Sequence, residues 1–398
     1  MTPRVAVVAT EESHPWSEGA LLVSRLCGAL ACGAEVELLL AGPPNAAGDG
    51  HDGAVTVRRF DAPAVPERRR LAVRRALLGP QSAEATIDCG CVTGARRRLA
   101  GTLAPAAQSI LIAAAGGDAA ELFRRLRTVR YDLAVFVGYG SASTCAGVDA
   151  VEGRCPWALV PAATGDADLW NPAVGQILRA ASRIVVTGEA EAATLAACAP
   201  GLRPGVVRDV GFVAQVNAMA SRAPAYGFDG RPTVVVARDW SEPSGQHRLL
   251  EWCDALRRDL GPEAAVRLVG PGTQRLPRRL RAEAAASRTD VWRWMAHALV
   301  VLDAEPHRLL GREVLEAFLF GTPVVVAADG GATRSHAESG DGGLWFRSYA
   351  ELLASVSALG DPALRAALGG QGRRYATERF GDTAAFIRRV DDAVLEVA

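Results

Sequence analysis

The sequence predicts an α/β protein built from two doubly wound parallel sheets, and three observations support this prediction. Short β-branched runs alternate along the chain with longer Ala-, Leu- and Arg-rich segments of helical periodicity, which is typical of βαβ units. The chain has 398 residues, 49% of them hydrophobic and 22% charged, which is enough for two domains with sizeable cores. A Gly-, Pro- and Ala-rich stretch at 197–232 separates two halves, each long enough for its own sheet.

The strands are predicted from runs of four to six apolar or β-branched residues. In the first half they lie near Val5–Ala9, Glu35–Leu40, Val55–Phe60, Leu133–Val137, Trp157–Val160 and Ile184–Thr187. In the second half they lie near Thr233–Ala237, Val266–Val269, Leu299–Leu302 and Val324–Ala327. The segment from 370 to 398 has an amphipathic helical pattern and follows the second sheet.

Charge and composition exclude several classes of function. The chain has 44 basic and 44 acidic residues, and every basic residue is arginine. The absence of lysine excludes Schiff-base chemistry and a Walker-A phosphate loop. A net charge of zero argues against a nucleic-acid partner. With no long apolar stretch and no signal peptide in the sequence, we expect a cytoplasmic protein without a membrane span, which leaves room for peripheral membrane association.

The most informative segment follows the predicted strand Leu299–Leu302. Gly311 opens a helix on which Glu313 and Glu316 lie three residues apart and therefore on one face. A glycine at a helix N-terminus lets backbone N–H groups approach a phosphate closely, and a carboxylate one turn later can accept hydrogen bonds from a ribose diol. The alternative is that both glutamates simply favour the positive end of the helix dipole.

The segment LLGREVLEAFLFGTPVVVAADGG at 309–331 resembles the signature of retaining GT-B glycosyltransferases of family 4. In that signature a Glu, seven residues and a second Glu in LEA precede a Gly-x-Pro-Val-Val strand. The segments RIVVTGEAEAATL, DVGF, PTVVVARDW and RLVGPG occupy the other places expected in this family, in order. The resemblance therefore extends over the whole chain and is stronger in the second half.

The resemblance implies a role for individual residues. Glu316 would bind the ribose hydroxyls of a nucleotide-diphosphate sugar, with Glu313 beside it. Gly311 and Arg312 would place backbone N–H groups at the diphosphate. Arg238, at the end of the strand VVVA, matches the arginine that stabilises the departing diphosphate. In the first domain, Gly19 resembles the second glycine of a phosphate-approaching pair whose first position holds Glu18.

Three positions depart from the family pattern. Arg308 stands where the family's sugar-contacting Glu is expected, and Ser244-Gly245 stands where a Lys-Gly binds the diphosphate. Thr164 replaces a first-domain histidine. Arg308 can bind an acidic donor sugar, can act as a second clamp on the diphosphate, or can point to solvent while Glu305 or backbone amides take its place.

The resemblance implies a GT-B fold, two Rossmann-like domains facing a cleft. We expect an acceptor-side domain at 1–210, a nucleotide-sugar domain at 211–374 and a helix at 375–398 that crosses back to the first domain. The implied activity is retaining transfer of a sugar to a glycan, lipid or small-molecule acceptor, without metal or cofactor, the nucleotide-diphosphate sugar being a co-substrate. Asp166-Ala167-Asp168 has a metal-binding form but is more typical of a capped turn. The alternative is a catalytically silent homologue that binds or scaffolds an active transferase.

Overall fold

The computed structural model divides into two compact units. The first contains Met1–Phe212 and Ala384–Ala398, and the second contains Val213–Thr383. The structure describes residues 2–10, 17–42, 50–62, 119–164, 169, 172–203, 205–222, 225, 228–240, 246–273, 276, 282–284, 287–305 and 308–397.

The first unit is built on a sheet whose strands are parallel except for one at its edge. The strand order is β3-β4-β2-β1-β5-β6-β7-β8, and β3 pairs antiparallel with β4. The strands are β1 (Arg4–Thr10), β2 (Glu35–Gly42), β3 (Gly50–Asp52), β4 (Val55–Asp61), β5 (Leu133–Val137), β6 (Trp157–Val160), β7 (Arg183–Val186) and β8 (Val207–Asp209).

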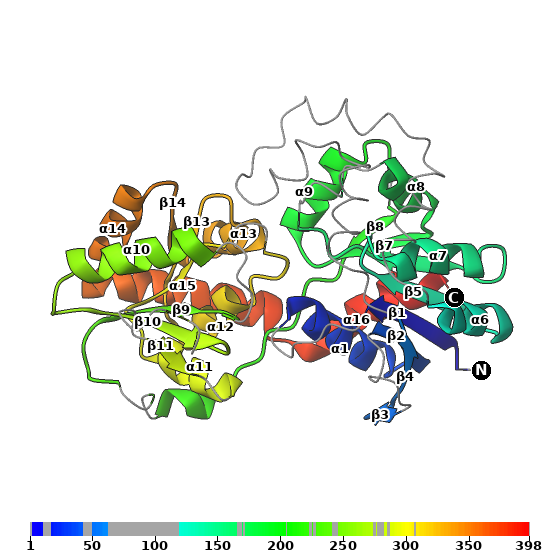
Figure 1. The fold of residues 1–398 in the computed structure, drawn as a ribbon, viewed down its shortest axis with the longest axis horizontal. Coiled ribbons are helices and arrows are strands. Elements are labelled where there is room, and N and C mark those ends of the chain that lie inside the picture. The colour runs from blue at the N-terminus through cyan, green and yellow to red at the C-terminus, as the bar shows by residue number, and fades with distance from the viewer. Residues whose placement is uncertain are drawn as a thin grey trace. The chain divides into compact units, whose positions relative to one another are not determined.

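Helices cover the first sheet on both faces (Figure 1). They are α1 (Glu18–Leu30), α6 (Ala120–Thr128), α7 (Ala142–Val151), α8 (Pro172–Ala180), α9 (Glu189–Cys198) and α16 (Thr383–Val394), and the short 3₁₀ helix Leu395–Val397 follows α16. One core forms where α6 and α7 pack on alternate residues of the central strands, such as Ala6, Val8 and Phe136. Arg389 of α16 donates to the carbonyl of Val210 at 2.8 Å, which ties the C-terminal helix to this unit.

The second unit contains a wholly parallel sheet. Its strands are β9 (Thr233–Ala237), β10 (Ala265–Gly270), β11 (Ala282–Ala284), β12 (Val300–Asp303), β13 (Val324–Ala327) and β14 (Gly343–Phe346). The order β11-β10-β9-β12-β13-β14 is that of a Rossmann sheet, in which the third, second and first strands lie beside the fourth, fifth and sixth. β9 and β12 are neighbours, with Val234 paired to Val300, and they mark the point where the winding reverses.

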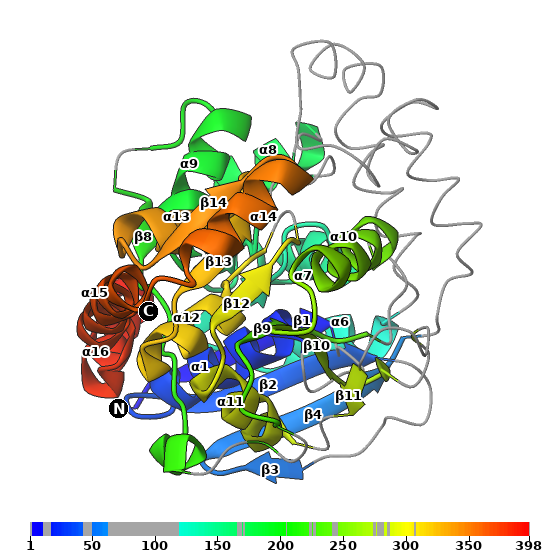
Figure 2. The same ribbon diagram turned by 90° about the vertical axis from the view of Figure 1, so that its left-hand side faces the viewer.

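The helices of the second unit form two layers. They are α10 (Gln246–Asp259), α11 (Arg288–Ala296), α12 (Arg312–Phe320), α13 (Ala332–Ser339), α14 (Tyr349–Ala358) and α15 (Pro362–Phe380), together with the 3₁₀ helix Ala218–Arg222. Figures 1 and 2 show α10 and α14 on one face of the sheet and α11 and α12 on the other. The first layer buries Leu249, Cys253 and Leu352 against Val234 and Val236 of β9.

All ten predicted strands are present, with ends that agree to within about two residues, which confirms the alternating pattern inferred from the sequence. The sequence analysis missed β3, β8, β11 and β14, which are only three or four residues long. The division between the units falls at Phe212–Val213, and the C-terminal segment joins the first unit from Ala384. Among the helices of the described residues, none is long and apolar enough to cross a membrane.

Candidate functional site

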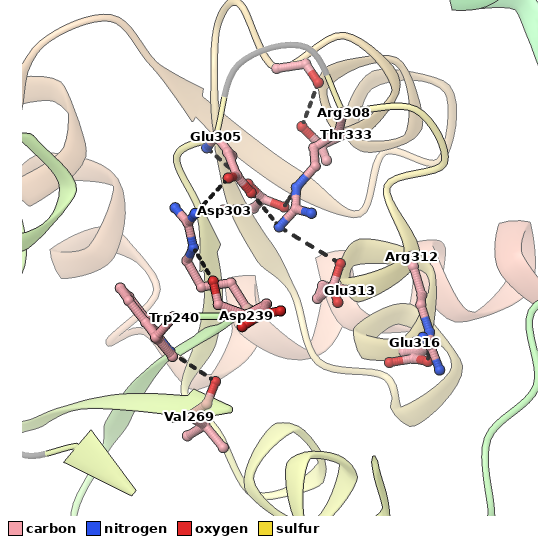
Figure 3. A network of polar contacts seen from close by, with 12 residues as sticks. Asp239, Trp240, Val269, Asp303, Glu305, Arg308, Arg312, Glu313, Glu316 and Thr333 are labelled. Atoms are coloured by element: carbon pink, nitrogen blue, oxygen red, sulfur yellow. Dashed lines mark hydrogen bonds and ion pairs between the residues drawn. The ribbon is translucent and has the colours of Figure 1, made fainter. Parts of the chain in front are cut away.

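The switch point of the second sheet brings two strand ends together. In open α/β sheets, ligands bind beyond the carboxyl ends of the strands at the place where the winding reverses. In this unit that place is defined by Arg238, which follows β9, and by Asp303, which ends β12. The loops after these two strands therefore carry the candidate site (Figure 3).

Arg238 is held rigidly at the end of β9. Its backbone N–H donates to the carbonyl of Val269 at 3.1 Å, and its side chain is 7% exposed. Nε donates to the carbonyl of Asp239 at 3.2 Å, and the guanidinium carbon lies 5.3 Å from the centre of the Trp240 ring. Trp240 is itself fixed by a hydrogen bond from its indole N–H to the carbonyl of Val269 at 3.2 Å.

The loop after β12 supplies carboxylates that contact two arginines. Glu305 pairs through Oε1 with Nη2 of Arg238 at 2.8 Å and through Oε2 with Nη2 of Arg308 at 2.6 Å. Nε of Arg308 lies 3.5 Å from Oδ2 of Asp303, and its Nη2 lies 3.9 Å from Oε2 of Glu313. Arg308 thus contacts three carboxylates and does not point to solvent.

Helix α12 begins close to this loop because the backbone turns sharply at Gly311, immediately before the first helical residue. Gly311 is the N-cap, with φ 60° and ψ 40°, a left-handed conformation that favours glycine. A Cβ at this position would lie 3.0 Å from Cδ2 of His336 and 3.2 Å from Cγ2 of Thr333. Substitution is therefore disfavoured both by conformation and by space.

His336 fixes the backbone that leads into α12. Its Nε2 lies 2.9 Å from the carbonyl of Leu310, and its Nδ1 lies 3.0 Å from the hydroxyl of Tyr375. Burial lowers the pKa of His336 to about 4, so the ring is neutral near pH 7. The neutral ring then donates a hydrogen bond from Nε2 to the Leu310 carbonyl, and its Nδ1 accepts a hydrogen bond from the Tyr375 hydroxyl.

Glu313 and Glu316 lie on one face of α12, as their spacing predicts, and they share one arginine. Arg288, the first residue of α11, donates from Nη2 to Oε1 of Glu313 at 3.0 Å. It also binds Glu316 with two groups, Nε to Oε1 at 3.1 Å and Nη2 to Oε2. Nε of Arg312 donates to Oε1 of Glu316 at 2.8 Å.

These contacts have consequences for the two carboxylates. Burial opposes ionisation of Glu313, but Arg288, Arg308 and Arg312 outweigh it and lower the pKa of Glu313 to about 2. Both oxygens of Glu316 already accept hydrogen bonds from arginine, and this residue is only 2% exposed. Its expected contact with a ribose stays a prediction and uses the acceptor capacity that remains.

Four arginines and four carboxylates meet at this end of the sheet, and we call them the arginine–carboxylate cluster. Its members are Arg238, Arg288, Arg308, Arg312, Asp303, Glu305, Glu313 and Glu316. The formal charge of the cluster is zero. It combines fixed guanidiniums, which bind phosphate or carboxylate oxygens, with carboxylates, which accept hydrogen bonds from hydroxyls.

Several buried polar atoms of the cluster lack a hydrogen-bond partner among the residues that the structure describes. They include Nη1 of Arg238, Oδ2 of Asp303 and Oε2 of Glu313. Burial raises the pKa of Asp303 to about 6, and nearby Arg308 only partly offsets this effect. Because buried polar atoms in proteins are nearly always hydrogen-bonded, these atoms leave hydrogen-bonding capacity for a polar ligand at this end of the sheet.

The other predicted residues lie elsewhere. Gly19 is in the first unit, in the first turn of α1, where its N–H donates to Oγ of Ser17 at 3.0 Å. Thr164 also belongs to the first unit and follows β6. Ser244-Gly245 and Asp166-Ala167-Asp168 lie outside the described residues. Within the described ranges, no group of three or more His, Cys, Asp or Glu side chains is arranged to hold a metal ion.

Comparison with known proteins gives matches in structure only. No family model and no curated protein sequence matches the chain. The structure is similar to sucrose-phosphate synthase from Thermosynechococcus elongatus, with TM-score 0.65, 16% identity and 97% of each chain covered. It is similar to Anabaena HepE in complex with UDP-glucose, with TM-score 0.63, 16% identity and 98% of each chain covered.

A third similar structure is α,α-trehalose 6-phosphate synthase from Burkholderia multivorans, with TM-score 0.67 and 12% identity. The match covers 100% of this chain and 99% of that one. These neighbours are GT-B proteins, and the likeness spans both units. The chain therefore has the GT-B fold, which confirms the fold class predicted from the sequence.

Sequence reasoning missed several members of the site. Asp303 could have been found, because it directly follows a predicted strand whose carboxyl end was expected to face a ligand. Arg288 and His336 gave no such signal. Arg288 lies 25 residues from Glu313, and His336 lies 26 residues from Leu310, so only the tertiary structure brings them to α12.

Proposed function

We propose that the chain is a glycosyltransferase whose second unit binds a nucleotide-diphosphate sugar at the arginine–carboxylate cluster. The single observation that carries the proposal is the position of Arg238 and α12 at the switch point of a Rossmann sheet. Structures of Anabaena HepE, which has the same fold, are complexes with UDP and glucose or with UDP-glucose, which supports the same class of donor.

Each part of the site has a place in this function. The first N–H groups of α12 lack partners within the helix, and together with the helix dipole they favour a diphosphate. Arg238 donates to the diphosphate as negative charge grows on it. Glu316 accepts hydrogen bonds from the ribose, and Asp303 and Glu313 accept them from sugar hydroxyls at the oxygens that lack hydrogen-bond partners in the described structure.

The reaction transfers the sugar from a diphosphate to an acceptor hydroxyl. The bond between the anomeric carbon and the diphosphate oxygen breaks, with its electron pair leaving on the diphosphate. A bond from the acceptor oxygen to the same carbon forms, and the acceptor proton ends on the leaving group or in solvent. We propose retention at the anomeric carbon and no metal requirement, following the resemblance of residues 309–331 to family 4.

Ligand binding followed by turnover tests this function. Thermal unfolding is measured with UDP, GDP and ADP, with their glucose conjugates and with the parent nucleosides. A cognate nucleoside diphosphate at about one hundred times its Kd should add about 2.7 kcal/mol of stability, and the nucleoside alone should add far less. If no nucleoside diphosphate or conjugate stabilises the protein, the proposed function is wrong.

A second candidate is a non-catalytic GT-B protein that scaffolds an active transferase. The observation that favours it is the neutral charge of the cluster, in which every arginine named above is paired with a carboxylate. The two candidates separate in a turnover assay that follows release of the nucleoside diphosphate in the presence of an acceptor mixture. Specific binding without any release of product supports the scaffold.

A further inference from the structure

Glu305 forms an ion pair with Arg238, whose guanidinium the proposed function assigns to the diphosphate. Among the described residues, Glu305 is the carboxylate paired with Arg238, at 2.8 Å. Nε of the same guanidinium donates to the carbonyl of Asp239, and Nη1 is buried without a hydrogen-bond partner in the described structure. A phosphate that binds Arg238 through its two Nη groups therefore meets the negative charge of Glu305 at Nη2 (Figure 3).

Glu305 is the most exposed carboxylate of the cluster. Its side chain is 26% exposed, compared with 5% for Asp303 and Glu313 and 2% for Glu316. Its backbone N–H is anchored to Oδ1 of Asp303 at 2.9 Å, so the side chain can rotate while the main chain stays in place. Of the four carboxylates, Glu305 is thus the one that can change its partner most easily.

Arg308 offers Glu305 a second partner. Nη2 of Arg308 lies 2.6 Å from Oε2 of Glu305, while Oε1 of the same carboxylate contacts Arg238. The two contacts use different oxygens of Glu305, so Arg308 can keep the carboxylate when Arg238 binds another anion. Two negative groups on one guanidinium would repel each other, so an arriving diphosphate favours rotation of the carboxylate away from Arg238.

We propose that Glu305 is an internal competitor for the diphosphate at Arg238 and that Arg308 holds the displaced carboxylate when a donor is bound. This inference rests on the proposed function and deepens it, because it identifies a residue that sets donor affinity. It also gives Arg308 a role that the resemblance did not imply. The arginine that replaces the family's sugar-contacting Glu binds a carboxylate of its own chain.

Calorimetric binding of nucleoside diphosphates to Glu305→Gln tests the inference. Glutamine keeps the shape of the side chain and removes its charge. We expect the cognate nucleoside diphosphate, chosen from UDP, GDP and ADP, to bind about tenfold more tightly to Glu305→Gln, since an ion pair no longer has to break. The affinity for the parent nucleoside should not change, because it lacks the diphosphate.

Two further variants control for charge and test the second partner. Glu338→Gln makes the same charge change at an exposed glutamate that pairs with Arg334 on α13, and it should leave the affinity unchanged. Arg308→Gln should weaken nucleoside diphosphate binding several-fold, because Glu305 then has Arg238 as its remaining partner. In the double variant that carries Glu305→Gln and Arg308→Gln, most of this loss of affinity should disappear. A double-mutant cycle measures the coupling between the two residues.

The possible outcomes separate this inference from the proposed function. Tighter binding of the diphosphate alone, with coupling to Arg308, supports the inference. If wild type binds the diphosphate and Glu305→Gln binds it equally or more weakly, Glu305 is not a competitor, and the proposed function stands. If neither protein binds any nucleoside diphosphate, both the proposed function and the inference are wrong.

Discussion

Both units bury carboxylates among arginines. The two groups lie at different ends of their sheets, and they differ in how fully the carboxylate oxygens are hydrogen-bonded. In the first unit, Glu37 lies near the amino end of β2 and contacts Arg4, Arg58, Arg125 and the hydroxyl of Tyr131. In the second unit, the arginine–carboxylate cluster lies at the carboxyl ends of β9 and β12.

The difference lies in how fully the carboxylates are satisfied. Both oxygens of Glu37 accept hydrogen bonds. Burial opposes its ionisation, but these partners lower its pKa overall. By contrast, one oxygen of Asp303 and one of Glu313 lack hydrogen-bond partners in the described structure. The acceptor capacity of Glu37 is used by its own chain, whereas Asp303 and Glu313 keep acceptor capacity for a ligand.

The largest expected effect is on stability, at Glu37. Glu37→Gln leaves three guanidiniums facing a neutral group, and we expect a loss of about 3 kcal/mol in the free energy of unfolding. Glu35→Gln, on the same strand at an exposed carboxylate that pairs with Arg4, should cost less than about 1 kcal/mol. Chemical denaturation measures both. Equal losses in the two variants would contradict a structural role for the Glu37 network.

The next effect is a pH dependence at His336. Its pKa is about 4 in the folded protein, compared with 6.5 for an unperturbed histidine, so the unfolded chain binds more protons between these values. Acidification from pH 6.5 to 4 should therefore remove about 3 kcal/mol of the stability contributed by His336. In His336→Gln this component is absent, so the stability gap between wild type and variant should narrow as the pH falls.

Asp303 titrates in the same range with the opposite sign. Its pKa is raised from 3.8 to about 6 by burial, so the folded state binds more protons and its contribution to stability falls as the pH rises from 4 to 6. The variant pairs must therefore be compared with each other, because the wild-type curve contains both effects. If the difference in free energy of unfolding between wild type and His336→Gln does not change with pH, the pKa of His336 is the same in the folded and unfolded states, and the prediction is wrong.

Arg238 should matter for function much more than for stability. Arg238→Ala removes a donor from the leaving diphosphate, and we expect turnover to fall about a hundredfold while donor affinity changes less. Arg231→Ala is the matched control, because Arg231 lies just before the amino end of the same strand and pairs with Asp229. Steady-state kinetics with the cognate donor decide the matter, and normal turnover in Arg238→Ala would place this residue outside the site.

The smallest effect concerns the entry into α12. Gly311→Ala forces a side chain into a left-handed conformation and against His336, so we expect a loss of about 1–2 kcal/mol in the free energy of unfolding. Gly28→Ala is the control, because a Cβ at this position in α1 meets no atom within 4 Å. Thermal unfolding compares the two, and an unchanged melting temperature in Gly311→Ala would show that the α12 entry tolerates a side chain.

The sequence by itself determined the order of strands and helices along the chain. Periodicity is a local property, so alternating apolar runs predicted ten strands and the βαβ winding. The motif at 309–331 predicted that Gly311 begins a helix with Glu313 and Glu316 on one face. Strand ends also follow from local pattern, which is why Arg238 could be assigned to the carboxyl end of β9.

Only the tertiary structure decided which charged groups meet. The sequence contains 44 arginines and no lysine, so no local signal separates Arg288 from an exposed arginine. Its contact with Glu313 and Glu316 arises because α11 and α12 pack on the same face of the sheet. The pairing of Arg238 with Glu305 likewise depends on β9 and β12 being neighbours at the switch point. Ion pairs between distant segments depend on how the strands are ordered in space, and local sequence does not encode that order.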